Sequence, residues 1–322
     1  MFCLAACAPG RPGTAPLTLR AAGSLWGFVA PWDSRRDSLS GADAPRLDVI
    51  VGGWMQLDST TGVPTQLYPD DPARGLATSS RIAFITTRAG RSGDRFHPEA
   101  VRALASSTSA LDLAASRAAA LMARGGYSGA LLELEEQPKA DLPATLRVVR
   151  TIADTLHRRG LRIGVQIPGP DTAAYPTAAF AAVADFLAIK LFDEHWPASA
   201  PGPIASPMWV RRTLARRVAD VGAERIVAVL PVFSYLWRAN QPAVRLSFDE
   251  ARRAAAEANV EIARDPTSHS LHAVNPNSWE LWMTDRDLLQ ALEAEVRSLG
   301  VDRIALWRLG LEDDRIWPAL RP

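Results

Sequence analysis

The fold prediction rests on the stretch YSGALLELEE, which covers residues 127–136. It follows an Ala-rich helical run and a Gly-Gly break, and its apolar residues are typical of a parallel strand buried on both faces. Because side chains alternate across a strand, Glu133 and Glu135 share one face with Leu131. Two carboxylates on one face are costly to bury unless they are paired or functional. Parallel barrels carry their chemistry at such a strand end; the alternative is a solvated end that is merely acidic.

Seven further segments have strand character, and helical segments lie between most of them. The expected strands cover residues 25–30, 47–54, 82–86, 127–136, 162–167, 186–192, 225–230 and 303–307. The expected helices cover residues 111–124, 142–159, 173–183, 211–221 and 287–299. This order predicts an α/β fold, the (β/α)8 TIM barrel. The rival is an open doubly wound sheet, for which a Gly-rich phosphate-binding turn after an early strand would be typical, and the sequence has none.

The alternation of strand and helix breaks off between the seventh and eighth expected strands. Ser247 begins a helix there, because Glu250 three residues later completes a capping box. Residues 260–263 and 271–274 are expected to pair as strands around a polar turn. We therefore expect a small α+β insertion on the mouth of the barrel after strand seven, at about residues 234–285.

The composition is that of an ordinary globular protein. The chain has 322 residues, of which 48% are hydrophobic and 22% charged. Its net charge of +1 gives no reason to expect nucleic acid or an anionic membrane surface as a partner. Ten tryptophans against four tyrosines indicate either stacking surfaces, for sugars among other ligands, or a Trp-rich core. We expect residues 21–322 to form a single barrel domain that needs no partner to bury its core and is a monomer.

The N-terminal residues have a character of their own. Both cysteines, Cys3 and Cys7, lie within the first seven residues, so the body of the chain has no disulfide and no thiolate metal site. The sequence Leu-Ala-Ala-Cys that ends at Cys7 resembles a bacterial lipobox, in which the cysteine is lipidated. We expect residues 1–20 to be a lipoprotein-type signal remnant and tether, with membrane attachment only through a lipid on Cys7. A location in the cell envelope, the periplasm or outside the cell follows.

Four further segments carry a resemblance to a known family. They are WGFVAPWD at residues 26–33, KLFDEHW at 190–196, PVFSYLW at 231–237 and ALWRLGLED at 305–313. In this order on a barrel, they resemble glycoside hydrolase family 18, the chitinase and N-acetylglucosaminidase family, and particularly its bacterial cell-wall branch. The resemblance extends from about residue 26 to residue 317. It implies a barrel that hydrolyses a polymer of N-acetylhexosamine.

The fourth-strand motif of that family is Asp-Gly-x-Asp-x-Asp-x-Glu, and this chain departs from it. Ser128 and Leu131 stand where the family has its first and second Asp, and Glu133 stands for the third. Glu135 stands for the family's general acid, which must be protonated to act. The family's third Asp orients the acetamido group of the substrate, whose oxygen attacks the anomeric carbon. The resemblance thus implies Glu135 as the catalytic acid and Glu133 as an orienting or stabilising carboxylate.

Two more departures lie on the sixth strand. Phe192 stands for a family Tyr whose hydroxyl contacts the acetamido oxygen, and Lys190 stands for a family Met. By alternation both side chains point into the barrel, where the substrate would bind. An interior lysine needs a charge partner. Because Glu133 lies on the inward face of strand four, we expect a Glu133–Lys190 ion pair below the mouth.

The resemblance also implies aromatic and polar contacts to a sugar. Trp307 at the end of strand eight resembles the family's platform under the sugar in the cleavage subsite; the alternative is a Trp of the core. Asp193 contacts the sugar or holds its own loop. Three further tryptophans line a groove or belong to the core: Trp54, Trp237 and Trp282. His195 has no His or Cys near it at metal-ligand spacing, so we expect no metal and no cofactor.

Three functions fit this pattern. The first is a glycoside hydrolase acting on a β-linked amino-sugar polymer, chitin-like or from peptidoglycan or exopolysaccharide, with an oligosaccharide or polysaccharide as its partner. The second is a glycosidase with an altered substrate, in which Glu133 acts directly as nucleophile or base. The third is a non-catalytic carbohydrate-binding barrel, since a fold does not fix a function. The altered motif favours the third, whereas retention of Glu135, Asp193 and Trp307 favours a hydrolase.

Overall fold

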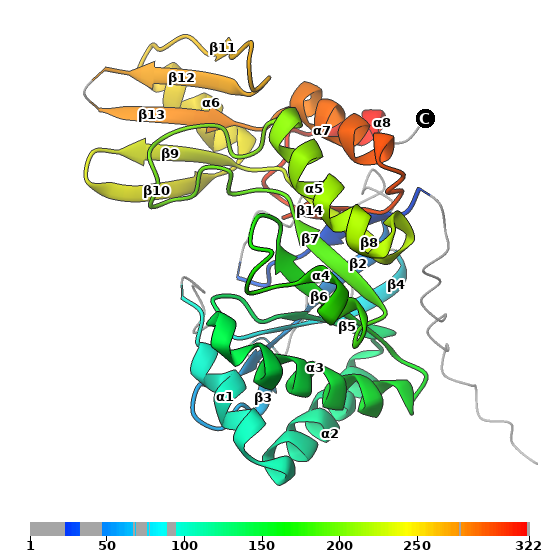
Figure 1. Cartoon of the computed structure of the whole chain (residues 1–322). Coiled ribbons are helices and arrows are strands. Elements are labelled where there is room, and N and C mark those ends of the chain that lie inside the picture. The colour runs from blue at the N-terminus through cyan, green and yellow to red at the C-terminus, as the bar shows by residue number, and fades with distance from the viewer. Residues whose placement is uncertain are drawn as a thin grey trace, which may run out of the picture.

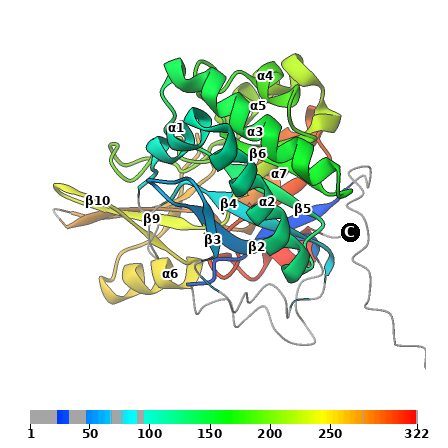
Figure 2. The same cartoon turned by 90° about the horizontal axis from the view of Figure 1, so that it is seen from below.

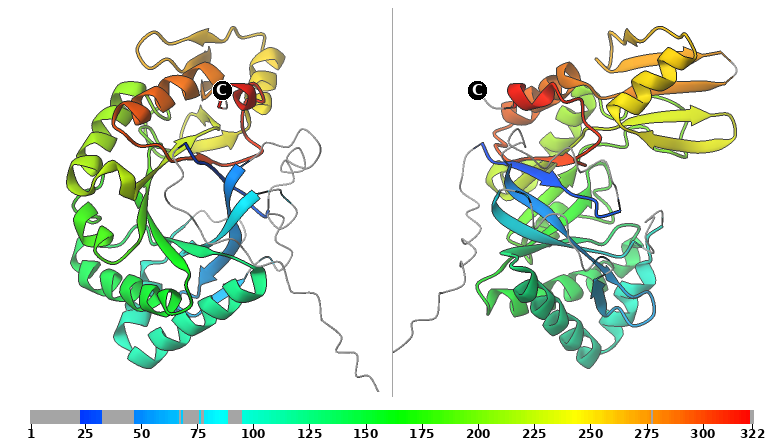
Figure 3. Two further views of the ribbon diagram at one scale, coloured as in Figure 1. Left: turned by 90° about the vertical axis from the view of Figure 1, so that its right-hand side faces the viewer. Right: turned by 180° about the vertical axis from the view of Figure 1, so that it is seen from behind.

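Eight parallel strands close into a barrel with helices around it, as Figure 1 and the view down the barrel in Figure 3 show. The computed structural model describes residues 23–32, 47–66, 68, 76, 78–88, 95–276 and 278–320. Around the ring the strands follow the order β1-β14-β8-β7-β6-β5-β4-β2, and β1 pairs with β2 to close it. The predicted (β/α)8 TIM barrel is confirmed. The expected tether at residues 1–20, with Cys7, lies outside the described residues.

The elements have the following bounds. The barrel strands are β1 (Leu25–Phe28), β2 (Leu47–Leu57), β4 (Thr78–Thr86), β5 (Gly129–Glu133), β6 (Arg162–Pro168), β7 (Phe186–Lys190), β8 (Ile226–Pro231) and β14 (Ile304–Trp307). A short strand, β3 (Pro64–Gln66), pairs antiparallel with β2. The helices on the barrel are α1 (Pro98–Ser106), α2 (Thr108–Gly125), α3 (Leu142–His157), α4 (Thr177–Ala181), α5 (Pro207–Val221), α7 (Arg286–Ser298) and α8 (Ile316–Ala319). Two 3-10 turns are η3 (Lys139–Asp141) and η4 (Ala223–Arg225).

Two elements, β5 and α4, are about half as long as the sequence predicts. β5 ends at Glu133, and the backbone at Glu136 has a φ of 58°, so the chain has left extended geometry before the predicted strand end. α4 begins only after Pro176, its N-cap. The Asp171 side chain accepts two backbone N–H groups just upstream and holds that part of the predicted helix in a turn.

Alternation along β5 divides its side chains between two cores. Leu131 is fully buried inside the barrel among aromatic residues such as Phe84 and Phe186. Leu132 and Leu134 point the other way, into the outer core between strands and helices. Each buried side chain of this kind contributes roughly 1.5–3 kcal/mol. The predicted alternation is confirmed, and it sends Glu133 toward the interior.

A five-stranded antiparallel sheet follows β8, and Figure 2 shows it projecting from the barrel. Its strands, in order across the sheet, are β10 (Gln241–Leu246), β9 (Ser234–Arg238), β13 (Trp279–Met283), β12 (Leu271–Asn275) and β11 (Ala263–Arg264). Helix α6 (Phe248–Glu257) begins with the predicted capping box and packs Phe248 and Ala251 against one face of the sheet. The predicted α+β insertion is confirmed. The strand β10 escaped prediction because none of its residues is buried, so it shows no apolar alternation.

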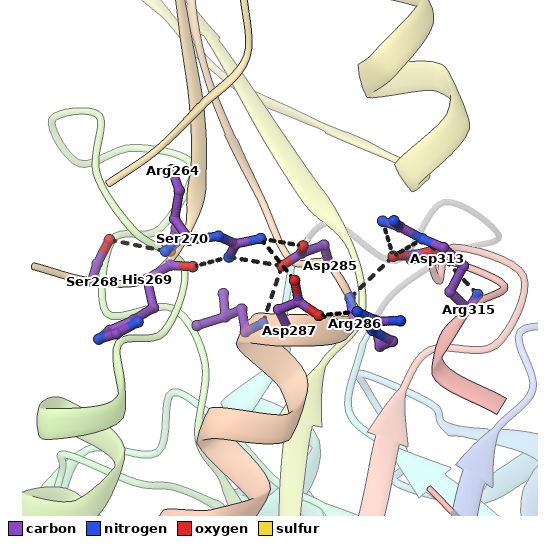
Figure 4. Close-up of polar contacts among 10 residues, drawn as sticks. Arg264, Ser268, His269, Ser270, Asp285, Arg286, Asp287, Asp313 and Arg315 are labelled. Carbon is purple, nitrogen blue, oxygen red and sulfur yellow. Dashed lines mark hydrogen bonds and ion pairs between the residues drawn. The ribbon is translucent and has the colours of Figure 1, made fainter. Parts of the chain in front are cut away.

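Charged side chains join the insertion to the barrel (Figure 4). Arg264 on β11 donates to both carboxylate oxygens of Asp285, at 2.5 and 3.2 Å. Asp285 is also the N-cap of α7 and accepts the backbone N–H of Leu288 at 3.1 Å. Asp313, after β14, accepts the backbone N–H of Arg286 at 3.1 Å. The start of α7 therefore holds the insertion on one side and the C-terminal segment on the other.

Replacing Asp285 by alanine should lower the free energy of unfolding by about 2 kcal/mol, since it removes the cap and a largely buried partner of Arg264. Denaturant titration of the whole chain measures this loss. Asp287→Ala is the matched control, because Asp287 lies two residues away with a half-exposed side chain. It should change stability by about 0.5 kcal/mol or less. Equal losses in both variants would contradict the assigned role of Asp285.

The free energy of unfolding should depend on pH through the carboxyl group of Glu312. Its side chain is buried after β14, and burial raises the pKa of its carboxyl from 4.5 to about 7, although the N–H groups of Gly310 and Leu311 donate to it. Because the pKa of Glu312 is higher in the folded state, the protonated carboxyl makes its full contribution to folding stability below pH 4.5. This contribution is lost as the pH rises through 7. The loss should be about 3 kcal/mol. Unfolding titrations between pH 4 and 8 should show it in the natural chain and not in Glu312→Gln; parallel curves would refute it.

None of the described helices combines the length and the apolarity needed to cross a lipid bilayer.

Candidate active site

Glu133 is the last residue of β5 and lies inside the barrel with no exposed surface. Its Oε2 accepts hydrogen bonds from the Thr86 hydroxyl at 2.7 Å and from Arg88 Nε at 3.2 Å. Its Oε1 accepts from the Gln166 amide at 3.0 Å. Burial raises the pKa of the Glu133 carboxyl above its ordinary value, and the charge of Arg88 opposes this rise. Both oxygens are thus occupied by groups of the protein.

Lys190, at the end of β7, pairs with Glu135 and not with Glu133. Its Nζ donates to Glu135 Oε2 at 2.7 Å, and both side chains are almost fully buried. The predicted Glu133–Lys190 pair is therefore wrong, and the strand register explains why. Glu133 is level with Gln166 and Gln166 with Ala188, so Lys190 lies two residues nearer the mouth, at the level of Glu135. Arg88 from the end of β4, which sequence analysis did not single out, takes the place beside Glu133.

Asp193 is the second carboxylate near Lys190. Its Oδ2 lies 3.7 Å from Lys190 Nζ, and its Oδ1 accepts the Tyr235 hydroxyl at 3.0 Å. Tyr235 in turn accepts a hydrogen bond from Arg245 at 3.0 Å, so the insertion holds this side of the mouth. Burial by itself would lower the pKa of Lys190, but the carboxylates of Glu135 and Asp193 outweigh it and raise that pKa. One ammonium group thus faces two carboxylates, one from the segment after β5 and one from the segment after β7.

The aromatic residues singled out in the sequence fall into two groups. Trp307 stacks on Phe192 with centroids 5.8 Å apart, and Trp54 donates from Nε1 to the Val29 carbonyl at 2.7 Å. All three of these rings are more than nine-tenths buried at the top of the barrel interior. Trp237 and Trp282 lie on the insertion instead. Contact of any of them with a sugar stays a prediction.

A cavity beside the insertion does not include the two glutamates among its lining residues. It has a volume of about 780 Å³ and lies between the segment after β7 and the tips of the insertion hairpins. Trp237, Trp279 and Glu280 are among its lining residues. This cavity is therefore separate from the carboxylates at the mouth.

Two buried polar atoms at the mouth have no protein partner. Among the described residues, neither Glu135 Oε1 nor Trp307 Nε1 makes a hydrogen bond. Buried polar atoms are almost always paired, and an exception calls for an explanation such as a catalytic role or a bound water. A carboxylate oxygen and an indole N–H are the groups by which proteins contact sugar hydroxyls and glycosidic oxygens. Both atoms therefore suit a carbohydrate ligand.

The segment that carries Glu135 is held from behind by residues that sequence analysis missed. The Tyr175 hydroxyl donates to the Leu134 carbonyl at 2.9 Å and accepts the Gln137 N–H at 3.0 Å. Arg217 on α5 is fully buried and donates to the loop before α4 through five hydrogen bonds, to Gly169, Tyr175, Thr177, Pro168 and Asp171. Nothing in the sequence distinguishes Arg217 from the other arginines of its helix, three of which are exposed.

In the described ranges, no group of three or more His, Cys, Asp or Glu side chains is placed to hold a metal ion. The site consists of carboxylates, cations and aromatic rings. Such a set can protonate a leaving group, stabilise positive charge and stack against a sugar ring.

Comparisons with known proteins agree with this arrangement. No family model matches the chain. Over 207 residues it is 25% identical to a protein of Bacillus subtilis named "Putative sporulation-specific glycosylase YdhD", covering 59% of this chain and 49% of that protein. Over 215 residues it is 19% identical to the "Uncharacterized glycosylase YvbX" of the same organism, covering 62% of each. The chain thus spans less than two thirds of the length of these curated relatives.

Solved structures share the barrel over nearly the whole chain. A chitinase from Chromobacterium violaceum superimposes with a TM-score of 0.77 at 20% identity, covering 94% of this chain and 98% of that one. The spore cortex-lytic enzyme SleL of Bacillus megaterium gives 0.80 at 16% identity, covering 92% and 73%. A mutant of a class V chitinase from Nicotiana tobaccum, in complex with NAG4, gives 0.71 at 12% identity, covering 93% of this chain and 97% of that one. The predicted resemblance to the chitinase-like, cell-wall branch of this fold is confirmed.

Proposed function

We propose that the chain is a glycoside hydrolase that acts on a β-linked amino-sugar polymer, chitin-like or from peptidoglycan or exopolysaccharide. Glu135 is the general acid, and Glu133 is a buried stabilising carboxylate. The observation that carries the proposal is Glu135 itself, a buried carboxyl at the carboxyl end of β5 with one oxygen unpaired, in a barrel shared with chitinases. The binding of NAG4 to a chitinase of the same fold supports an amino-sugar substrate. A lipid anchor at Cys7, a cell-envelope location and a monomeric state belong to the proposal on sequence grounds alone.

A second candidate is a carbohydrate-binding barrel without catalysis. It is favoured by the 2.7 Å ion pair between Lys190 and Glu135, because a carboxylate paired with an ammonium group has no proton to donate. The acid function needs Lys190 to release Glu135 when substrate binds. Asp193 is 3.7 Å away and can take the ammonium group over.

Hydrolysis assays on the purified chain decide between the two functions. The substrates are N-acetylglucosamine oligomers, peptidoglycan fragments, deacetylated oligomers and plain glucans, each tested beside Glu135→Gln. Product release by the natural chain, lost in Glu135→Gln, is the expected result. No turnover on any substrate, with oligosaccharide binding retained by both proteins, would establish the binding function instead.

A further inference from the structure

The cavity of about 780 Å³ beside the insertion has the features of a ligand-binding site. Its volume lies within the roughly 300–1,000 Å³ that is usual for pockets that bind small molecules. Glu135 and its partner Lys190 are not among its lining residues. We infer that this cavity is a second, non-catalytic carbohydrate site, which holds a neutral sugar chain beside the mouth of the barrel. The inference rests on the proposed function, because the chain that is held is taken to be the polymer that is cut.

Two walls form the cavity, and hydrogen bonds fix them. One wall is the segment of residues 197–201 after β7, and the other is the end of the insertion sheet at β9, β10, β12 and β13. Figure 1 shows the segment between β7 and α5 beside the β9–β10 hairpin, and the Ala243 N–H donates to the Pro197 carbonyl at 2.8 Å. The Ser199 hydroxyl accepts the Trp196 N–H at 3.1 Å. A ligand is therefore spared the cost of ordering these walls.

Two tryptophans line the cavity. Trp237 on β9 is 4% exposed, yet among the described residues its Nε1 has no hydrogen-bond partner. Trp237 is paired with Glu280 across the sheet, so both side chains lie on one face, while Leu236 and Leu281 pack with α6 on the other. Trp279, next to Glu280 on β13, is half-buried. Indole rings stack on the apolar faces of sugar rings, and an indole N–H can donate to a sugar hydroxyl.

The polar groups of the lining suit an uncharged ligand. Arg238 and Glu280 are the charged residues among those that line the cavity, and their charges cancel. The other polar side chains are amides and hydroxyls, from Ser199, Asn240, Gln241, Asn275 and Ser278. Such groups both donate and accept hydrogen bonds, as do the hydroxyl and acetamido groups of a neutral amino sugar. An anionic polymer would meet no excess of positive charge here.

A pair of aromatic rings joins the cavity to the mouth of the barrel. Trp237 and Tyr235 meet edge to face with centroids 5.4 Å apart. The Tyr235 hydroxyl donates to Asp193, which lies 3.7 Å from the ammonium group of Lys190. A polymer held in the cavity therefore lies next to the mouth. Its effective concentration at the mouth rises, although the cavity touches none of the atoms that react.

Binding to insoluble chitin tests the site directly. Trp279→Ala removes one ring of the cavity, and Trp196→Ala is the matched control, because its ring is 53% exposed on the facing segment but does not line the cavity. Both substitutions are made in the full Glu135→Gln chain, which leaves the polymer uncut under the proposed function. Sedimentation with chitin should show at least about fivefold weaker binding for Trp279→Ala and a change below about twofold for Trp196→Ala.

Kinetics in the otherwise natural chain test whether the site acts apart from the mouth. Trp279→Ala should raise KM on chitin about fivefold or more and leave kcat unchanged, because the lost contact is equal in the ground state and the transition state. The 4-nitrophenyl glycoside of the N-acetylglucosamine dimer is short enough to occupy the mouth alone. Its KM should stay within about twofold of the natural value.

The outcomes separate the inference from the proposed function. Equal binding of chitin by the two tryptophan variants would overturn the inference, as would a Glu135→Gln chain that does not bind chitin. An equal rise of KM on chitin and on the short glycoside would make the cavity part of the catalytic cleft and also overturn it. A chain that binds chitin through Trp279 but cuts nothing would refute the hydrolase and uphold the site. If circular dichroism shows that Trp279→Ala is unfolded, Trp237→Phe, which keeps a ring without the N–H, should show the same loss.

Discussion

Glu135→Gln is expected to slow hydrolysis by about 10²–10⁴-fold, the usual contribution of a positioned general acid. The amide fills the same space and can still accept a hydrogen bond from Lys190, but it has no proton to give to the leaving oxygen. Asp193 remains within 3.7 Å of Lys190, so the ammonium group keeps a counter-charge. Turnover should therefore fall while oligosaccharide binding persists. Measurement of kcat on a cleaved oligomer, with binding followed by calorimetry, gives both quantities.

The adjacent glutamate provides the matched control. Glu136 follows Glu135 in the chain, but its side chain is exposed and its backbone has turned away from the strand. Glu136→Gln removes the same charge from the same segment and should leave kcat within about twofold, since it touches no group of the site. A Glu135→Gln variant as active as Glu136→Gln would show that another group supplies the proton.

Arg217→Ala should destabilise the protein by about 3–5 kcal/mol, the cost of leaving several buried acceptors without a donor. The guanidinium donates to four backbone carbonyls and one hydroxyl, at distances from 2.6 to 3.0 Å. Burial lowers the pKa of Arg217 to about 10, still well above neutral pH, so the guanidinium is charged at neutral pH. Denaturant titration and thermal unfolding measure the loss.

Arg216→Ala is the control for this substitution, because Arg216 is the preceding residue on the same helix and is exposed. It should change the free energy of unfolding by about 0.5 kcal/mol or less. The turnover rates of the two variants give a second comparison. The loop that Arg217 holds carries Tyr175, which bonds on both sides of Glu135, so any folded Arg217→Ala protein should also turn over more slowly. A variant of Arg217 as stable as that of Arg216 would refute its role as an anchor.

The sequence determined the barrel and the strand at whose carboxyl end the two glutamates lie. Period-two alternation along β5 was enough to place Leu131 and Glu133 inside and Leu132 outside, because a one-residue change of register would reverse every side chain. The capping box likewise fixed the start of α6 from two residues three positions apart. These are local rules, and each can be applied without knowing what lies across the barrel.

Only the tertiary structure decided how the charges are paired. Which cation meets which carboxylate depends on the stagger between strands, and that stagger brings Lys190 level with Glu135 and leaves Glu133 to Arg88. The same holds for Arg217, whose five acceptors lie 40 or more residues away in the sequence. Sequence patterns report which face a side chain occupies. Ion pairs and hydrogen bonds at about 3 Å depend on the relative height of separate elements, which the closed barrel alone sets.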